Sequence, residues 1–338
     1  MLKSKELSAE EFDEYVLANH PEANILQSAK WGQVQEYRGF KVIRIGLTDD
    51  GELVAAFQGF IRDAKRGRYL EIPGGPLINW TNSQNVSDLT DEIGKVAVKH
   101  KCVFARIRPQ IETSPLVLGE LKANNFRKAP FHLNAEHTIL LDLSKSEDQM
   151  LSDMRRQTRY EIRRALKDKD IRVNNDNNIK TFQIFRGIQA DTAKRQNFIP
   201  PSIEELDAIR RGCGDDVTVY YASHEGTIYS MALVVRHGEE VDYLEAASLP
   251  EARKFPLAYA LQWEIIRDAR NAGYKRYNFW GIAATDDPKH RFANVTTFKK
   301  GFGGDVMVYC PAHDLVINKF KYAINYTIEI IRKKIRHL

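Results

Sequence analysis

The sequence has only three cysteines, and this scarcity excludes two classes of protein. Cys102, Cys213 and Cys310 lie far apart in the 338 residues. They form no CxxC pair and no Cys/His cluster with the spacing of a metal site. The pattern therefore excludes a disulfide-stabilised secreted domain and a zinc module, and we expect buried, reduced thiols and no metal.

Long apolar runs are also missing. No stretch reaches the roughly 20 apolar residues that a membrane-spanning helix requires. The first residues, LKSKELSAEEFDE, form a polar run without the apolar centre of a signal peptide. We therefore expect a soluble, cytoplasmic protein, and peripheral contact with the inner membrane surface stays open as an alternative.

Several catalytic signatures are absent as well. The chain contains no Walker loop, no dinucleotide-binding fingerprint and no serine-hydrolase elbow, so we expect no cofactor.

The overall composition is that of a folded protein with a mild charge. Its 50 basic and 45 acidic residues give a net charge of +5, which is too mild to identify a nucleic-acid binder by itself. Hydrophobic residues make up 43% of the chain, enough for a folded core, and the length favours about two domains.

The order of the predicted elements favours a mixed α/β (α+β) fold that repeats its plan. The first half shows a helix, three strands, a helix, a strand, a helix and a strand, at residues 8–20, 41–47, 53–61, 69–72, 90–100, 102–107, 114–124 and 138–143. The second half shows a helix, a strand, two helices, three strands, a helix and a strand, at residues 148–169, 171–174, 179–194, 203–210, 217–223, 227–236, 240–247, 258–272 and 276–279. We therefore expect one domain of residues 1–145 with 312–338, and a second of residues 146–311.

The segment from Arg276 to Gly304 carries the clearest sign of a site. A strand pattern leads into a loop rich in Asp and Pro and then into the run FKKGFGG at residues 298–304. In an extended run, Phe298 and Phe302 would anchor the chain while a lysine points outward, and the glycines would permit close backbone approach. Such an arrangement suits an anionic or acyl-transfer ligand.

Five segments in register resemble the FemABX family, the aminoacyl-tRNA-dependent transferases that add amino acids to the side bridge of peptidoglycan precursors. They are QSAKWG at 27–32, RYEIRRA at 159–165, KRQNF at 194–198, DYLEAAS at 242–248 and the segment from Arg276 to Gly304. The resemblance covers almost the whole chain and implies two acyltransferase-like domains of the GNAT type. Because the sequence has no heptads for a coiled-coil arm, short members without this arm, such as FemX, are the better match.

The resemblance also implies the site residues. Lys299 matches the lysine of the family's FK motif, so Lys299 with Phe298 is the expected catalytic pair. Transfer from an activated ester requires positioning and stabilisation of an oxyanion, which a lysine beside a glycine-rich loop supplies. The expected substrate contacts are Gln27, Trp31, Tyr243, Tyr259, Gly281, Gly303 and Gly304. For the general base, the carboxylates of Asp142, Glu245, Asp286 and Asp287 are open alternatives.

The chain departs from the family pattern where relatives contact the phosphates of a UDP-linked acceptor. Those relatives have a lysine and an arginine where this chain has Gln35 and Pro201. An aspartate of some relatives is replaced by Arg108, which excludes a base at that position. We expect Arg106, Arg108, Lys194 and Arg195 to supply the missing charge, and we regard a lipid-linked precursor as an alternative to the UDP-linked one.

Two basic segments have both a structural and a functional interpretation. On a helix, Arg156, Arg159, Arg163 and Lys167 share one stripe, which is either solvated or contacts the acceptor arm of tRNA. From Leu315 onward, apolar residues at spacings of three and four alternate with lysines and arginines. This pattern predicts an amphipathic helix that packs on the first domain, contacts anionic lipid, or does both.

Two further function classes remain. A GNAT enzyme that uses acyl-CoA needs a phosphate loop R/Q-x-x-G-x-G/A, and the nearest run, at residues 298–303, lacks the leading Arg or Gln. A catalytically silent RNA-binding module would not need the glycine-rich loop. We therefore expect a monomeric aminoacyltransferase with aminoacyl-tRNA and a peptidoglycan precursor as partners.

Overall fold

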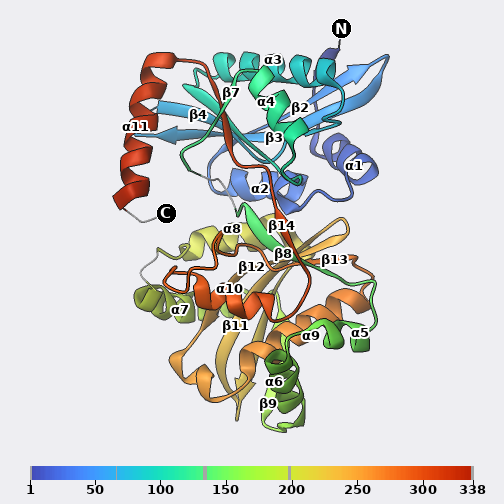
Figure 1. The fold of residues 1–338 in the computed structure, drawn as a ribbon, viewed down its shortest axis with the longest axis vertical. Helices are drawn as coiled ribbons and strands as arrows, with labels where there is room; N and C mark the ends of the chain where they lie inside the picture. Colours follow the sequence, from blue (N-terminus) through green and yellow to red (C-terminus); the bar gives the residue numbers. More distant parts are fainter. Residues whose placement is uncertain (1, 66, 132–134, 197–198, 336–338) are drawn as a thin grey trace. The chain divides into compact units, whose positions relative to one another are not determined.

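The chain folds as two compact units, each with its own mixed β-sheet (Figure 1). The computed structural model describes all residues except 1, 66, 132–134, 197–198 and 336–338. The first unit comprises residues 1–136 and 308–338, and the second comprises residues 137–307. The predicted α/β fold with two mixed sheets is confirmed.

The first unit is built on a sheet in the order β1-β2-β3-β4-β6-β15-β7, with β5 paired to β3. Its strands are β1 (Lys3–Glu6), β2 (Lys41–Asp49), β3 (Glu52–Ala64), β4 (Gly67–Gly74), β5 (Leu77–Ile78), β6 (Phe104–Pro109), β7 (Phe126–Lys128) and β15 (His313–Val316). Its helices are α1 (Ala9–Asn19), the 3-10 turn η1 (Ile25–Gln27), α2 (Ala29–Tyr37), α3 (Ser83–Lys99), α4 (Pro115–Ala123) and α11 (Lys319–Ile335).

Strand β3 shows how the sequence builds the layers of this unit. Ala55 and Phe57 join a core that includes residues of α3, whereas Ala56 between them joins a core with residues of α1. Successive side chains of a strand point to opposite faces. Helices α1 and α3 therefore cover opposite faces of the sheet (Figure 1).

The second unit has a sheet in the order β14-β8-β13-β12-β11-β10-β9. Its strands are β8 (His137–Asp142), β9 (Ile171–Asp176), β10 (Val217–His224), β11 (Thr227–His237), β12 (Glu240–Ser248), β13 (Arg276–Asn278) and β14 (Asp305–Val308). Its helices are α5 (Glu147–Asp153), α6 (Arg156–Lys167), α7 (Ile179–Gln196), α8 (Ile203–Cys213), η2 (Gly214–Asp216), η3 (Pro250–Lys254), α9 (Leu257–Asn271) and α10 (Ala293–Lys300). Met150, Ile162 and Ile266 from α5, α6 and α9 share one core with this sheet.

The units divide at different residues from those expected. The strand predicted at 138–143 is β8, and it pairs with β13 in the second sheet instead of closing the first domain. Residues 137–145 therefore lie in the second unit, and residues 308–311 lie in the first. The partner of β8 lies far along the chain, so local sequence gave no sign of this pairing.

Two segments have a different local structure from the predicted one. The run around Lys299 is not extended, because residues 293–300 form helix α10. The single helix predicted over 148–169 is two helices, α5 and α6, and the backbone is extended at Met154 between them. Both differences change where the charged side chains point.

Candidate active site

Lys299 lies on α10 with its side chain buried in the second unit. Only 7% of the residue is exposed. Its Nζ donates a hydrogen bond to the Gly281 carbonyl at 2.7 Å and lies 5.6 Å from the ring centroid of Tyr243. Burial lowers the pKa of Lys299 from 10.5 to about 7, and the negative charge of Glu245 opposes this shift only in part. The lysine of this run that points outward, as one was predicted to do, is therefore Lys300, which is exposed, and Lys299 is the buried one.

A strained loop holds the acceptor of the Lys299 hydrogen bond in place. Trp280, directly before Gly281, has a φ of 58°, a left-handed conformation that is unusual for a bulky residue. Thr138 Oγ1 donates to the Trp280 carbonyl at 3.0 Å, and the Ala283 amide donates to Thr296 Oγ1 of α10 at 2.9 Å. Strain of this kind persists where surrounding bonds impose it, and it is common at functional sites.

Strand β12 contributes the other groups near Lys299. The pairing of β11 with β12 shifts register between Tyr243 and Glu245, which leaves Leu244 as an extra residue in a β-bulge. Glu245 is half-buried and accepts a hydrogen bond from Gln189 Nε2 at 2.9 Å. Among the four candidate carboxylates, Glu245 acts on the charge of Lys299. The sequence offered no sign of the contributions of Gln189, Thr296 and Trp280.

An aromatic cluster surrounds the predicted catalytic Phe298. Its ring centroid lies 5.2 Å from that of Tyr259 and 5.1 Å from that of Phe302. Phe302 in turn packs against Phe279 at 5.5 Å. Phe298 and Tyr259, both among the predicted site residues, thus lie together. Burial raises the pKa of the Tyr259 hydroxyl, a shift that the nearby Arg155 opposes.

The remaining groups of the segment have structural contacts. Gly303 and Gly304 have φ values of 82° and 83°, and a Cβ on Gly304 would lie 2.5 Å from the Leu140 carbonyl oxygen. These two glycines are therefore required by the turn from α10 into β14, whatever they contact in a complex. Lys300 is exposed and pairs with Asp286 at 2.7 Å, while Asp287 accepts from the Lys289 amide at 2.9 Å.

In the first unit, the predicted contacts Gln27 and Trp31 are buried in its structure. The Gln27 amide donates to the carbonyls of Pro73 at 2.7 Å and Gln58 at 3.0 Å, and its oxygen accepts from the Gln58 amide at 2.9 Å. Gln27 therefore joins β3 to β4. Trp31 is buried on α2, where the Arg38 guanidinium lies 5.8 Å from its ring centroid.

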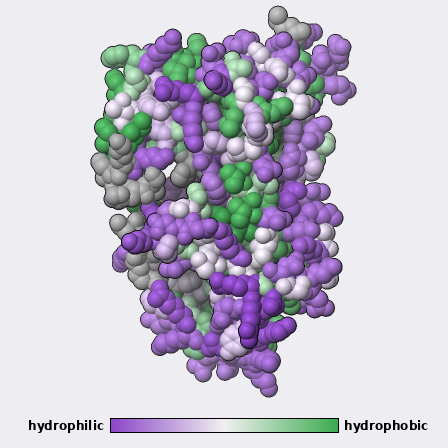
Figure 2. Space-filling model, viewed as in Figure 1, coloured by the Kyte–Doolittle hydropathy of each residue, from purple (hydrophilic) through white to green (hydrophobic). Residues whose placement is uncertain are grey.

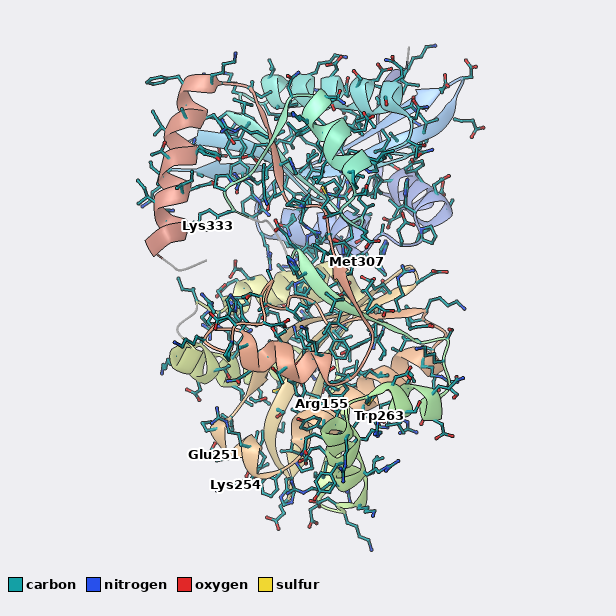
Figure 3. All side chains as sticks on the ribbon, in the orientation of Figure 1. Arg155, Glu251, Lys254, Trp263, Met307 and Lys333 are labelled. Atoms are coloured by element: carbon teal, nitrogen blue, oxygen red, sulfur yellow. The ribbon has the colours of Figure 1, made fainter. Side chains whose placement is uncertain are left out.

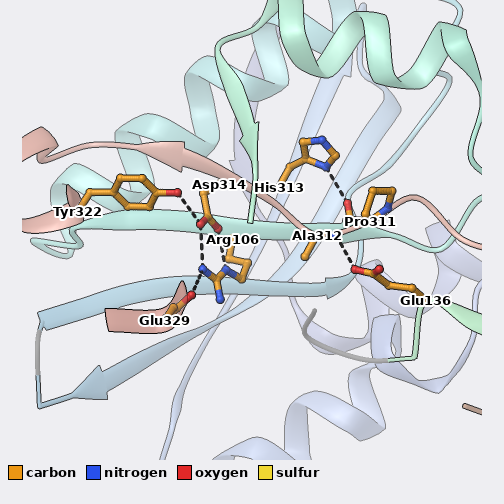
Figure 4. A network of polar contacts seen from close by, with 8 residues as sticks. All are labelled: Arg106, Glu136, Pro311, Ala312, His313, Asp314, Tyr322 and Glu329. Carbon is orange, nitrogen blue, oxygen red and sulfur yellow. Dashed lines mark hydrogen bonds and ion pairs between the residues drawn. The ribbon is translucent and has the colours of Figure 1, made fainter. Parts of the chain in front are cut away.

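Arg106 belongs to a buried network, which Figure 4 shows. Its guanidinium forms two hydrogen bonds to Asp314 at 2.7 and 2.8 Å and one to Glu329 at 2.9 Å. Tyr322 donates to the same Asp314 carboxylate at 2.9 Å. Burial alone would lower the pKa of Arg106, but the two carboxylates outweigh it and raise the pKa. The prediction of Arg106 as a substrate cation is therefore corrected, since its charge is neutralised within the fold.

Arg108 has a different environment from that of Arg106. It is 1% exposed, its Nη2 donates to Gln110 Oε1, and its guanidinium lies 5.5 Å from the Tyr309 ring centroid. Within the described part of the chain, its Nε and Nη1 have no hydrogen-bond partner. Burial lowers the pKa of Arg108 to about 10. This guanidinium thus retains two donors that are not satisfied by the fold.

Of the four basic residues that were predicted to share one stripe on helix α6, one is bound within the fold and three are exposed. Arg159 donates to the carbonyls of Leu151 at 3.4 Å and Ser152 at 2.9 Å, and also to that of Met154. Arg159 therefore caps the C-terminal end of α5, and the prediction that it contacts tRNA is corrected. The other three members, Arg156, Arg163 and Lys167, are exposed.

The surroundings of α6 are also polar. Figure 2 shows mainly hydrophilic residues over the end of the second unit that carries this helix. Arg155, at the start of α6 (Figure 3), donates its amide to the Gly301 carbonyl at 2.9 Å. The start of the basic helix is thereby joined directly to the residue that follows α10.

The other predicted cations are only partly described. Lys194 is exposed on α7, while the side chain of Arg195 lies outside the described residues.

A possible metal site that the sequence did not suggest consists of Asp168, Asp170 and His224, whose ligand atoms lie within 4.8 Å of one another. His224 stacks on Phe255 with ring centroids 3.8 Å apart. The absence of a metal and of a cofactor stays a prediction.

None of the helices in the described part of the chain combines the length and the apolar character needed to span a bilayer.

Comparisons with known proteins agree with this arrangement. The lipid II:glycine glycyltransferase of Staphylococcus aureus (strain USA300) is 21% identical over an alignment 400 residues long, gaps included, that covers 96% of this chain and 95% of the relative. The crystal structure of FemX has a TM-score of 0.86 at 19% identity and covers 95% of this chain and 99% of that one. A tandem GNAT protein from the clavulanic acid pathway has a TM-score of 0.58 at 10% identity, with coverages of 94% and 99%. The predicted pair of GNAT-like domains is confirmed.

The family model supplies the decisive comparison. The model of the FemAB family matches residues 7–129 and 217–329, more than half of the chain. The second match includes β12, with Tyr243 and Glu245, and α10, with Lys299. The predicted resemblance is therefore confirmed, and the chain belongs to the FemAB family and is a transferase.

Proposed function

We propose that this transferase moves an amino acid from aminoacyl-tRNA to an amine of a peptidoglycan precursor, with a lipid-linked acceptor favoured over a UDP-linked one. The observation that carries the proposal is the buried Lys299 amine held against the Gly281 carbonyl. The S. aureus relative is named for glycine transfer to lipid II, which supports the choice of acceptor. Gln35 supports this choice as well. Its side chain is buried and accepts a hydrogen bond from the Arg62 guanidinium at 3.1 Å. An uncharged amide thus occupies the position where relatives with a UDP-linked acceptor have a lysine.

The reaction needs a proton donor beside the carbonyl under attack. The acceptor amine forms a C–N bond to the ester carbonyl, and a tetrahedral intermediate with an oxyanion and an ammonium results. When the C–O bond breaks, the ribose oxygen leaves and takes a proton, while the ammonium loses one. An N–H group of Lys299 aimed at the oxyanion would stabilise this intermediate.

The lowered pKa of Lys299 suits this role. Because burial lowers the pKa of this amine to about 7, its charged and neutral forms are both accessible near neutral pH, and a developing negative charge can draw a proton onto it at little cost. A neutral Lys299 can also accept the ammonium proton and return it to the leaving ribose oxygen. Glu245 lies near enough to favour the charged form of Lys299, and we assign it this positioning role instead of that of a base.

Two other groups fit the proposed substrates. The exposed cations Arg156, Arg163 and Lys167 suit phosphates of the tRNA acceptor arm. The two unsatisfied donors of Arg108 suit an anionic group of the acceptor. Each role can be tested by substitution without disturbing Lys299.

The decisive experiment measures transfer of a radiolabelled amino acid from a charged tRNA pool to lipid II and, separately, to UDP-muropeptide. We expect label in lipid II, loss of transfer after RNase treatment, and at least a hundredfold slower transfer by Lys299→Ala. Lys300→Ala is the matched control, since Lys300 is exposed and its partner Asp286 is also on the surface. Transfer that survives RNase and requires acyl-CoA would overturn the proposal and assign the chain to CoA-dependent acylation.

A further inference from the structure

Helix α11 exposes large apolar side chains, although its other face is already packed. Phe320, Ile324 and Ile331 are 77%, 47% and 51% exposed. At about 100° per residue they fall within roughly 40° of one another around the helix. These three residues, named here the α11 stripe, share one solvent-facing side of the helix, with the exposed Thr327 between Ile324 and Ile331.

The stripe is not the side of α11 that holds the helix to the first unit. That side carries Tyr322, which packs with Val103 and Phe104, and Tyr326, whose ring lies 4.3 Å from the Arg127 guanidinium. The sequence pattern left open whether the apolar residues of this helix pack on the first domain, contact lipid, or do both. The structure buries tyrosines and leaves the stripe outside.

Charge on the exposed surface of α11 is of one sign. Lys319, Lys321, Arg332 and Lys333 are exposed and flank the stripe. Glu329, the one acidic residue in the sequence of this helix, turns inward and binds Arg106 at 2.9 Å. Figure 2 shows hydrophobic residues beside hydrophilic ones along the edge that α11 occupies.

We propose that the α11 stripe and its flanking cations dock the first unit on an anionic phospholipid surface. An apolar line between lysines and arginines matches the pattern of helices that lie in a bilayer interface, with aliphatic and aromatic side chains among the acyl chains and cations at the headgroups. The pairing of two copies through this face would place basic residues against basic residues, which opposes a symmetric contact. A nucleic acid would match the cations but not the isoleucines.

The inference goes beyond the proposed function, because docking requires neither substrate nor transfer. It would bring the enzyme to the surface where a lipid-linked acceptor resides. Docking persists if the transfer reaction proves to be a different one, and transfer to a water-soluble acceptor persists if docking fails. Separate assays therefore distinguish the two failures.

The test is flotation of the full chain with vesicles of phosphatidylcholine alone and of phosphatidylcholine mixed with phosphatidylglycerol. We expect binding to the mixed vesicles that weakens as salt is added. The stripe variant Phe320→Ser/Ile324→Ser/Ile331→Ser should lose at least tenfold in binding. The charge variant Lys319→Gln/Lys321→Gln should lose roughly 25-fold, since each cation contributes about fivefold near an anionic surface.

The matched control replaces exposed apolar residues of other helices in the same unit, in the variant Leu17→Ser/Val98→Ser/Leu116→Ser. It should bind within twofold of the wild type, and circular dichroism checks that every variant is folded. The charge variant keeps the test valid if the stripe variant does not fold. Equal binding to both vesicle types, no binding at all, or a stripe loss no larger than that of the control would overturn the proposal. A concentration-dependent dimer that the stripe variant abolishes would assign this face to a second copy instead.

Discussion

Lys299 is kept in an environment that disfavours its own charge, and this has a measurable cost. Between its folded pKa of about 7 and its ordinary value of 10.5, the unfolded chain holds a proton that the folded chain lacks. The free energy of unfolding therefore rises with pH across this window, and the cost of burying Lys299 is fully present below pH 7.

Lys299→Met should consequently stabilise the protein while abolishing transfer. We expect the free energy of unfolding to increase on the order of a few kcal/mol at pH 6, less the lost bond to Gly281. The gain should shrink as the pH approaches 10. Thermal unfolding at several pH values measures it, and Lys300→Met is the control. A gain that is the same at pH 6 and pH 10 would contradict the burial argument.

Arg108 gives a second prediction at the scale of one residue. Its guanidinium is buried and, among the described residues, hydrogen-bonds to Gln110 alone, so Arg108→Met should leave the fold at least as stable. If Arg108 contacts an anionic group of the acceptor, the KM for acceptor should rise at least tenfold, whereas the KM for aminoacyl-tRNA should stay unchanged. Steady-state kinetics with each substrate varied in turn separates these effects. An unchanged acceptor KM would exclude Arg108 as a contact of the acceptor.

At the scale of the element, helix α6 carries two kinds of basic residue: Arg159, which caps α5, and three exposed cations. The variant Arg156→Gln/Arg163→Gln/Lys167→Gln should weaken tRNA binding and lower the slope of log affinity against log salt by about 2 to 3, because each lost phosphate contact removes roughly 0.7 to 0.9. Filter binding at several salt concentrations measures this slope. Lys122→Gln/Lys180→Gln/Lys275→Gln removes the same charge elsewhere, and an equal effect of that control would show that only net charge matters.

Local sequence predicted most elements but not the two that shape the site. Helix α10 contains Val295, Thr296 and Thr297, β-branched residues that favour an extended chain. It is helical here with Thr296 bonded to Ala283 and Lys299 bonded to Gly281, contacts across a loop that no local pattern reveals. The break between α5 and α6 has no Pro or Gly, and the long-range bond between Arg155 and Gly301 accompanies it.

The sequence predicted which residues form the candidate site, a prediction that transfer assays have to test, but it predicted little of their geometry. The resemblance indicated Lys299, Phe298, Tyr243 and Tyr259, and the structure places them in one unit. It did not indicate that Lys299 is buried, because burial depends on strands and loops distant in sequence. The same limit explains Arg106, whose partners Asp314 and Glu329 lie about two hundred residues away.

At the scale of the whole molecule, the first unit depends on residues from both ends of the chain. β15 lies between β6 and β7 in the sheet, and Asp314 on β15 neutralises the buried Arg106. A fragment of residues 1–136 would lack an interior strand and leave Arg106 charged and unpaired, which is strongly destabilising. The sheet of the second unit, in contrast, draws almost entirely on residues 137–307.

We therefore expect the fragment 137–307 to fold alone and the fragment 1–136 to remain unfolded. Joining 1–136 to 308–338 through a short Gly-Ser linker should restore folding, because the Tyr309 amide bonds the Glu136 carbonyl at 2.8 Å and the two ends are adjacent. Circular dichroism and thermal unfolding of the three fragments measure this. The linked fragment carrying Asp314→Asn should unfold at a lower temperature than the linked wild type, since half of the charge that balances Arg106 is gone. A cooperative unfolding transition in 1–136 alone would show that β15 and its carboxylate are dispensable.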